Sequence, residues 1–215
     1  DSISMNIKKG ELMVILGPSG CGKSTTLRLI NKMVPLTKGT IKVRGRNIDD
    51  IDDVDLRKSI GYVIQSIGLF PHMSVARNIG TVPNLLNWEK EIIENKIDEM
   101  LRLVGLSPEK YKDKKPSQLS GGEAQRVGVA RALASDPDIV LMDEPFGAVD
   151  PINRLRLQRE FRQIQKSLNK TVLFVTHDVD EALLIADRIC IMDHGKIIQI
   201  GSPEEIVLKP ENDFV

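Results

Sequence analysis

The chain has 215 residues, and its 30 lysines and arginines balance 30 aspartates and glutamates to a formal net charge of zero. This length leaves room for one domain with a buried core and a small appended lobe, but not for two large domains. Without a net charge the chain has no long-range field toward DNA, RNA or an anionic surface, so we expect no nucleic-acid partner.

Cys21 and Cys190 are the only cysteines. They are too few for a disulfide framework and fit a reducing compartment, so we expect a cytoplasmic protein. No apolar run approaches the roughly 18 to 20 residues that cross a bilayer, so any membrane attachment has to come through a partner. The chain begins at Asp1 and ends at Val215 without a terminal signal, and we expect flanking elements beyond both ends.

A glycine-rich loop follows the first apolar run, Leu12 to Leu16. The loop reads Gly17-Pro18-Ser19-Gly20-Cys21-Gly22-Lys23-Ser24-Thr25 and opens a segment with Leu27, Ile30 and Val34 on one helical face. A strand, such a loop and a helix are the context of a P-loop, whose backbone N–H groups converge on phosphate oxygens. Lys23 is then expected to bridge the β- and γ-phosphates, and Ser24 to ligate Mg²⁺. The alternative is a structural turn that binds no nucleotide.

A hairpin is predicted next, with Ile41 to Val43 as its first strand, Arg44 to Asn47 as its turn, and Ile48 opening its second strand. The apolar run Ile60 to Ile64 then predicts a buried strand that ends before Gln65.

Helical periods replace strand patterns between Ser66 and Ser135. One helix carries Ile93, Ile97, Met100, Leu101 and Val104 on a single face. We therefore expect a helical subdomain, 67–135, inserted into an α/β core formed by 1–66 and 136–215. The charge cluster from Lys110 to Lys115 predicts a solvated face.

Leu119-Ser120-Gly121-Gly122-Glu123 begins a further helix within this segment. Ser120 and Glu123 fit a capping box, which is a purely structural helix start. Two glycines directly after the cap are poor helix formers, however, and a helix start bare of side chains lets a phosphate approach closely. The residues alone leave both interpretations open.

Asp143 and Glu144 follow the apolar run Ile139 to Met142, at the strand end where open α/β sheets place their sites. Asp143 is expected to hold Mg²⁺ through its water shell, and Glu144 to polarise the water that attacks the γ-phosphorus. The alternative is a pair of solvated carboxylates.

Thr171 to Thr176 predicts a core strand that ends at His177, with Asp178 and Glu181 set to cap the next helix. Two last runs, Ile189 to Met192 and Ile197 to Ile200, predict a hairpin and hence an antiparallel edge. The fold class predicted for the whole chain is α/β, with a mainly parallel sheet, an antiparallel β edge and the helical insertion.

The start at Leu119 to Glu123 resembles the signature of ABC-type ATPases, and the resemblance spans nearly the whole chain. The matching segments are Gly17 to Thr25, Gln65, Leu119 to Glu123, Asp143-Glu144, Gly147-Ala148-Val149-Asp150 and His177. The resemblance implies a P-loop NTPase core and an ATPase that uses ATP and Mg²⁺.

In this family two copies pack head to tail. Ser120, Gly121 and Gly122 of one copy then cap the γ-phosphate that lies in the other copy's loop, so each site is shared. The resemblance makes Asp150 the residue that couples the two sites.

The resemblance also assigns two residues close to the reacting phosphate. Gln65 senses Mg²⁺ and the attacking water, while the loop from Ser66 to Met73 lies near a membrane permease. His177 contacts the γ-phosphate and steadies Glu144.

The chain departs from the family pattern at two places, in the signature and in the contact with the adenine base. Glu123 stands where glutamine is frequent. The aromatic residue that stacks on adenine in these ATPases normally lies upstream of Asp1, so the chain holds no candidate for it.

Several stretches look most like ATPases of bacterial importers: Ser59 to Met73, Glu144 to Pro151 and Gly201 to Ile206. Asn31 to Val34 and Val63 to Pro71 are particularly similar to the osmoprotectant group, which imports glycine betaine, carnitine or choline. The resemblance implies an ATPase at the cytoplasmic face of the membrane, held by permease subunits and served indirectly by a solute-binding protein. Regulatory nucleotide-sensing domains often follow the ATPase in that group.

Two rival classes remain. An ABC ATPase that acts on DNA carries long coiled coils between the loop and the signature, and a ribosomal one carries tandem units; neither feature is present. A nucleotide sensor without hydrolysis could lose Glu144 and His177, and both residues are here.

Overall fold

A six-stranded sheet forms the centre of the computed structural model, which describes residues 3–65, 68–147 and 149–215. Its strand order is β4-β5-β6-β1-β7-β8. The strands are β1 (Leu12–Leu16), β4 (Ile60–Val63), β5 (Ile139–Asp143), β6 (Thr171–Thr176), β7 (Arg188–Asp193) and β8 (Lys196–Gly201). All neighbours are parallel except β7 and β8, which confirms a mainly parallel sheet with an antiparallel edge.

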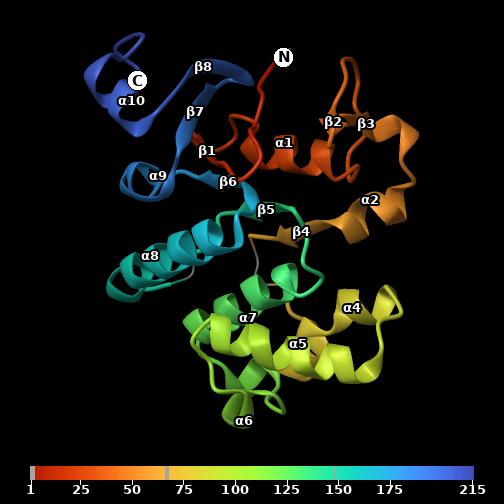
Figure 1. Cartoon of the computed structure of the whole chain (residues 1–215). Helices are drawn as coiled ribbons and strands as arrows, with labels where there is room; N and C mark the ends of the chain where they lie inside the picture. Colours follow the sequence, from red (N-terminus) through yellow and green to blue (C-terminus); the bar gives the residue numbers. More distant parts are fainter. Residues whose placement is uncertain (1–2, 66–67, 148) are drawn as a thin grey trace.

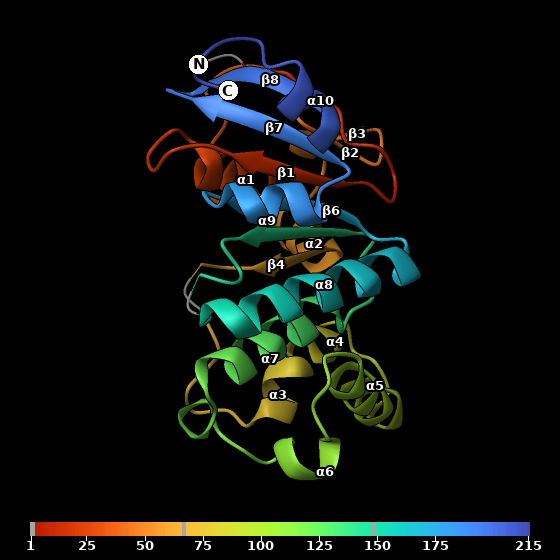
Figure 2. The same cartoon turned by 90° about the vertical axis from the view of Figure 1, so that its left-hand side faces the viewer.

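Helices cover both faces of this sheet. Figures 1 and 2 show α1 (Lys23–Ile30) and α2 (Asp53–Ser59) on one face, and α8 (Pro151–Leu168) and α9 (Val179–Ile185) on the other. The central strand β1 packs against both layers. Leu12 and Val14 belong to the cluster that includes α8 and α9, whereas Met13 and Ile15 belong to the cluster that includes α1 and α2. A strand buried on both faces reads as a continuous apolar run, which is why it could be predicted.

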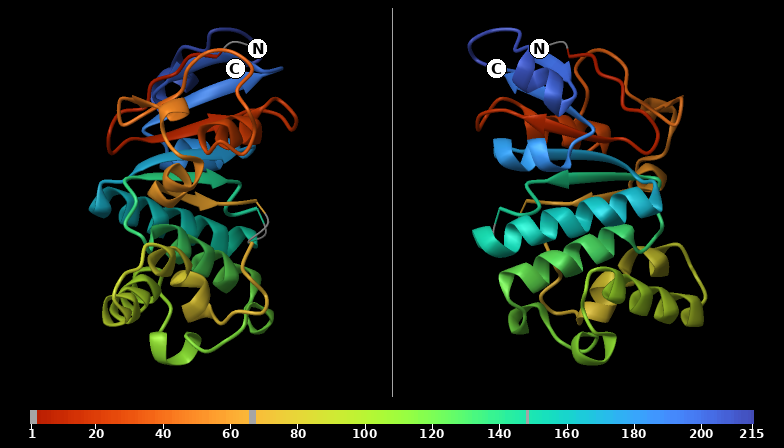
Figure 3. Two further views of the ribbon diagram at one scale, coloured as in Figure 1. Left: turned by 90° about the vertical axis from the view of Figure 1, so that its right-hand side faces the viewer. Right: turned by 60° about the vertical axis from the view of Figure 1, so that its left-hand side comes forward.

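The regular elements that the described residues between β4 and β5 form are all helical. They are α3 (Val75–Ile79), α4 (Thr81–Leu85), α5 (Lys90–Leu103), α6 (Pro108–Tyr111), the 3₁₀ turn η2 (Pro116–Gln118) and α7 (Gly121–Leu133). Figure 3 shows them gathered at one end of the sheet, beyond β4. The division at 66/67 and 135/136 stays a prediction, because Ser66 and Ile67 lie outside the described residues.

The hairpin predicted near residue 44 forms with a different register. Its strands are β2 (Lys42–Val43) and β3 (Arg46–Asn47), which make a separate two-stranded sheet. The turn is the pair Arg44-Gly45, with φ of 51° and 78°, and two positive φ values are typical of a tight type I′ turn. The prediction that Ile48 opens the second strand is wrong, because Ile48 begins the 3₁₀ turn η1 (Ile48–Asp50), which the Asn47 side chain caps.

Beside the antiparallel edge, α10 (Pro203–Leu208) packs against β8 and β7. Both cysteines are buried and unpaired, and burial raises the pKa of Cys190 to about 12. None of the described helices combines the length and the apolar character that a membrane span requires.

A buried carboxylate ties α8 to α9. Gln158 in α8 donates through Nε2 to Oε1 of Glu181 in α9 at 2.9 Å, and both side chains are about 4% exposed. Glu181 was expected to help cap α9; instead Asp178 alone provides the side-chain cap, and the Glu181 side chain turns to Gln158. Burial is the main cause that raises the pKa of Glu181 above its ordinary value of 4.5.

The raised pKa of Glu181 predicts a pH-dependent stability. Its contribution to folding is fully present below pH 4.5, its unfolded value, and is lost as the pH rises through the folded pKa. Glu181→Gln has no charge to bury, so the variant should lack this loss. Urea unfolding across pH 4 to 8 measures the free energy of unfolding of both proteins. The difference between the variant and the wild type is expected to grow as the pH rises. A gap of constant size would contradict burial as the cause.

Candidate functional site

The carboxyl ends of four parallel strands meet at one edge of the sheet. Gly17 follows β1, Glu144 follows β5, His177 follows β6, and Gln65 lies two residues after β4. Because β4, β5, β6 and β1 are consecutive neighbours, these residues come from one continuous edge. Open parallel sheets place their sites at such an edge.

The glycine loop is shaped to let a ligand approach its backbone. A Cβ at Gly17 would lie 2.1 Å from the carbonyl oxygen of Met192, so only glycine fits there. Gly22, with φ of 108°, precedes α1 without any side-chain cap, and no acidic residue lies in the first turn of α1. The N–H groups at this helix start are therefore open to an anion, and the loop fits a phosphate.

Lys23 lies across this loop. Its side chain is 5% exposed, and Nζ donates to the carbonyl oxygens of Gly17 at 2.7 Å and Pro18 at 2.9 Å. Among the described residues no carboxylate forms an ion pair with it. A buried ammonium with only carbonyl partners favours an anionic ligand, which again fits a phosphate chain.

Ser24 and Asp143 meet beside the loop. The Ser24 hydroxyl donates to Oδ1 of Asp143 at 2.8 Å, and Asp143 is 2% exposed. Burial is the main cause that raises the pKa of Asp143, with the charge of Glu144 adding to it. A positive ion would relieve both effects, and two hard oxygens suit Mg²⁺.

No cluster of three or more His, Cys, Asp or Glu side chains that could hold a metal lies in the described parts of the chain. The pair Ser24 and Asp143 nevertheless fits Mg²⁺, because this ion keeps several waters and takes further oxygens from substrate phosphates.

Glu144 joins the two other residues that were predicted to be catalytic. His177 Nδ1 lies 3.2 Å from its Oε1, and Gln65 donates through Nε2 to its Oε2 at 3.1 Å. The backbone N–H of Glu144 donates to Val175 O at 3.0 Å, and its φ is 45°. A positive φ is strained for a glutamate, and strain of this kind gathers at functional sites.

The signature residues begin α7, as predicted; the capping box forms, and the approach of a phosphate to this helix start stays a prediction. Ser120 N–H donates to Glu123 Oε2 at 2.8 Å and Glu123 N–H to Ser120 Oγ at 3.3 Å, so the capping box exists. Ser120 and Gly121 are also exposed, and a Cβ at Gly122 would meet no heavy atom within 4 Å. Packing therefore gives no reason for glycine at 122, whereas approach by a ligand does.

The structure does not bring the signature to the glycine loop of its own chain. Figure 1 shows α7 beyond β4 and β5, on the far side from α1. No hydrogen bond or ion pair among the described residues joins Ser120 to Lys23 or Ser24. A phosphate in the loop thus has no signature partner from the same chain.

Asp150 caps α8. Its Oδ1 accepts from the backbone N–H of Asn153 at 3.1 Å, and its Oδ2 accepts from the Asn153 side chain at 2.8 Å. This gives it a local structural role, and its coupling of two sites stays a prediction. Ala148, in the same motif, lies outside the described residues, as do Ser66 and Ile67 of the loop after Gln65.

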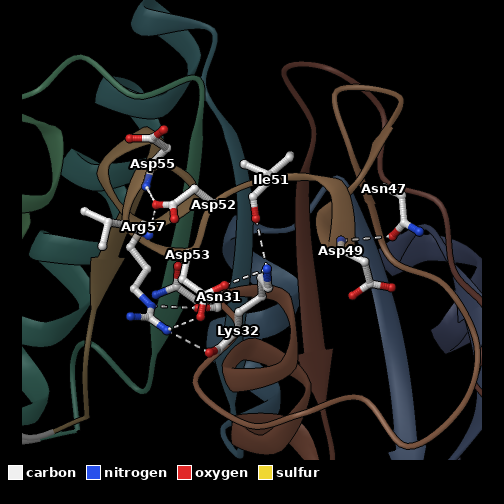
Figure 4. A network of polar contacts seen from close by, with 10 residues as sticks. Asn31, Lys32, Asn47, Asp49, Ile51, Asp52, Asp53, Asp55 and Arg57 are labelled. Carbon is white, nitrogen blue, oxygen red and sulfur yellow. Dashed lines mark hydrogen bonds and ion pairs between the residues drawn. The ribbon is translucent and has the colours of Figure 1, made fainter.

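Polar contacts hold the far end of α1. Lys32 pairs with Asp53 at 2.6 Å and donates to Ile51 O at 2.9 Å, while Arg57 donates to Lys32 O at 2.9 Å (Figure 4). The Lys32 bond is the main cause that lowers the pKa of Asp53. The predicted helix through Val34 is too long, because α1 ends at Ile30. The end of α1 is thus tied to α2, which steadies the helix that carries Lys23 and Ser24.

One side chain in the predicted solvated face behaves differently. Tyr111, inside the Lys110 to Lys115 cluster, is 8% exposed and donates its hydroxyl to Oε1 of Glu123 at 2.5 Å. The lysines on either side conceal it in the sequence, and no local pattern predicts this bond.

Comparisons with known proteins agree with this geometry. Residues 1–147 match the family model described as ABC transporter. The glycine betaine/carnitine/choline transport ATP-binding protein OpuCA of Bacillus subtilis is 53% identical over 100% of this chain and 56% of its own length. The spermidine/putrescine import ATP-binding protein PotA of Clostridium novyi is 43% identical over 99% of this chain and 60% of its own length. The chain thus spans somewhat more than half the length of these relatives.

Two solved structures share the fold. CbiO1 from Clostridium perfringens, part of the ABC transporter complex cbiONQ, has a TM-score of 0.87 and 32% identity over 96% of this chain and 83% of its own. The dimeric post-hydrolysis state of the ATP-binding cassette MJ0796 bound to ADP and Pi has a TM-score of 0.82 and 33% identity over 93% of this chain and 88% of its own. The glycine loop, the signature and the α/β fold with its helical insertion therefore have one common explanation: the chain belongs to the ABC transporter family.

Proposed function

We propose that the chain is the ATP-binding and ATP-hydrolysing subunit of an importer for a small solute. The observation that carries this proposal is the meeting of Gln65 and His177 on Glu144, next to Ser24 and Asp143 at the end of the phosphate loop. A structural turn or a pair of solvated carboxylates would not need this arrangement. A nucleotide sensor that does not hydrolyse ATP would not need Gln65 and His177 to hold the Glu144 carboxylate.

The residues of the loop, from Gly17 to Thr25, bind the phosphates of ATP, and Lys23 neutralises part of their charge. Ser24, Asp143 and Gln65 would hold Mg²⁺, which would supply positive charge that stabilises the negative charge on the phosphate oxygens. Glu144 accepts a proton from the water whose oxygen bonds to the γ-phosphorus, while the bond from that phosphorus to the β-phosphate oxygen breaks and ADP leaves. Gln65 and His177 each hold one oxygen of that carboxylate, so its orientation is fixed before the water arrives.

The second copy of the chain supplies Ser120, Gly121 and Gly122 to the phosphate, and Asp150 couples the two sites. The exposed signature, away from its own loop, supports this, and so does the dimeric state named for the MJ0796 neighbour. Further partners are transmembrane permease subunits, reached near Ser66 to Met73, and indirectly a solute-binding protein. They hold the ATPase at the cytoplasmic face of the membrane.

The solute is a quaternary amine such as glycine betaine, carnitine or choline. Support comes from the names of OpuCA and of the osmoprotectant import ATP-binding protein OsmV of Salmonella typhimurium, which is 49% identical over 100% of this chain and 56% of its own length. The PotA match favours a second candidate, an importer of polyamines.

An exchange experiment separates these two solutes. This chain replaces the matching segment of OpuCA in a Bacillus subtilis strain without other betaine uptake, and labelled glycine betaine uptake is measured. Restored uptake that Glu144→Gln abolishes is the expected result. Failure here, combined with restored putrescine uptake in the matching PotA exchange, would point to the polyamine importer.

Ser120→Arg tests the shared site. We expect it to abolish ATP turnover while the ATP affinity of the single chain changes by less than about twofold, because α7, which Ser120 caps, lies away from α1 and its loop in the same chain (Figure 1). Turnover and fluorescent-nucleotide binding measure the two effects. Ser202→Arg is the matched control, because Ser202 caps α10 with the same kind of box. Loss of ATP affinity in Ser120→Arg would show a local role instead.

A further inference from the structure

The start of α7 carries a hydrogen bond that its capping box does not need. One carboxylate oxygen of Glu123 closes the box by accepting from Ser120 N–H at 2.8 Å. The other oxygen accepts the hydroxyl hydrogen of Tyr111 at 2.5 Å. Tyr111 is the last residue of α6, so a donor from a separate helix reaches the first turn of α7.

The start of α10 shows the same box without such a donor. Ser202 N–H donates to Glu205 Oε2 at 2.7 Å, and Glu205 N–H donates to Ser202 Oγ at 3.2 Å. The corresponding distances in α7 are 2.8 and 3.3 Å. Both boxes cap their helices equally well, and no tyrosine hydroxyl reaches Glu205 in the described part of the chain. The bond from Tyr111 therefore does more than complete a cap.

Tyr111 is fixed from outside α7. Backbone N–H groups at the start of α3 hold the chain that follows it: Val75 donates to Lys114 O at 2.8 Å and Ala76 to Lys112 O at 3.0 Å. The ring itself is buried. Its hydroxyl is thus an anchor whose position α3 and α6 determine.

A positive charge accompanies the carboxylate. The Lys114 ammonium lies 4.3 Å from the centroid of the Tyr111 ring, a cation–π contact. The bonds from Tyr111 and from Ser120 N–H are the two main causes that lower the pKa of Glu123, so Glu123 is an anion at neutral pH. Glutamine, frequent at this position in the family, would bring no charge to be balanced.

We propose that Tyr111 is a positioning residue for the phosphate-facing start of α7 and acts through Glu123. The inference rests on the shared site of the proposed function. With one oxygen held by Tyr111, the carboxylate keeps its other oxygen on Ser120 N–H. The Ser120 hydroxyl accepts from Glu123 N–H, which leaves its own hydrogen to donate to a phosphate oxygen in the second copy.

This arrangement also compensates part of the negative charge of Glu123. A carboxylate at a helix start that faces a phosphate repels it. The Tyr111 hydroxyl takes up part of the negative charge in a hydrogen bond, and Lys114 lies on the same ring. Tyr111, Glu123 and Lys114 therefore act together.

The first test uses the single chain, without any need for dimerisation. Tyr111→Phe keeps the ring and removes the hydroxyl. Hydrogen exchange at the Ser120 amide is expected to speed up by about fivefold or more, because its acceptor is no longer fixed. The Ser202 amide of the α10 box is the internal control and should not change. An unchanged rate at Ser120 would overturn the proposal.

The second test measures ATP-dependent dimerisation in a Glu144→Gln background by sedimentation. Tyr111→Phe should raise the dimer dissociation constant by about tenfold while the ATP affinity of the single chain stays within about twofold. If Tyr111 had only a structural role, its substitution would change thermal unfolding but would not raise the dimer dissociation constant while sparing the ATP affinity of the single chain. An unchanged dimer constant would also overturn the proposal. If the Glu144→Gln parent does not dimerise, the proposal that two copies share each site fails. Hydrogen exchange at the Ser120 amide then still decides the role of Tyr111.

A third measurement covers the case in which Tyr111→Phe disturbs packing. Glu123→Gln removes the charge but leaves the ring in place. If Tyr111 acts through Glu123, the dimer constants of Tyr111→Phe, Glu123→Gln and the double variant are non-additive. Additive effects would mean that Tyr111 acts independently of Glu123, which would contradict the proposal.

Discussion

Glu144→Gln is expected to lower the turnover number for ATP by a factor of about 10² to 10⁴, the usual contribution of a positioned general base. The amide has the size of the carboxylate and retains one oxygen to accept from Gln65. It cannot take a proton from water. ATP binding depends on the loop and is retained, so the variant should accumulate as an ATP-bound dimer.

Steady-state phosphate release and sedimentation with ATP measure these two effects. Glu211→Gln, at an exposed position away from the site, is the matched control and should behave as the wild type. If Glu144→Gln hydrolyses ATP at an unimpaired rate, Glu144 is not the general base, and its contacts with Gln65 and His177 serve another purpose.

Lys23→Ala is expected to weaken ATP binding itself, by about 100-fold. The ammonium is buried against the carbonyl oxygens of Gly17 and Pro18, where few water molecules could replace it. Its removal takes away the charge-assisted bonds to the phosphates together with a support of the loop.

Isothermal titration calorimetry with ATP measures this loss. Lys38→Ala, which removes an exposed lysine from a connecting segment, should leave the affinity unchanged. Urea unfolding of both variants checks that the fold is intact. An affinity for ATP that Lys23→Ala does not change would refute the role given to the phosphate loop.

Much of the fold could be predicted because its signals are local. β1 and β6 are buried on both faces and therefore read as continuous apolar runs. The loop after β1 is recognisable because a glycine is required where Met192 O leaves no room for a side chain. α5 shows its buried face as a helical period in the sequence.

Other features depend on contacts that local patterns do not carry. The turn at Arg44-Gly45 takes two residues rather than four because both adopt positive φ. The sequence does not predict this, because a positive φ is not expected at a non-glycine residue such as Arg44. α1 ends at Ile30, before Val34, and Arg57 from α2 donates to the carbonyl oxygens of Asn31 and Lys32 just beyond that end.

The sequence predicts the members of the candidate site, but of the contacts among them only the one between His177 and Glu144. Gln65 and His177 lie 79 and 33 residues from Glu144 in the sequence, and they meet only because β4, β5 and β6 are neighbours in the sheet. The resemblance implied that His177 steadies Glu144. No local pattern predicts the role of Tyr111, because its partner, Glu123, lies in another helix and lysines surround it in the sequence.

Mixing two inactive variants tests the central claim that each site is built from two copies. Lys23→Ala breaks the loop and leaves the signature intact, whereas Ser120→Arg does the reverse. In a mixed head-to-tail dimer one site contains both defects and the other contains neither. An equal mixture should therefore recover about one quarter of the wild-type ATPase rate, since half of the dimers are mixed and each has one working site. A mixture as inactive as its two components would contradict the shared site.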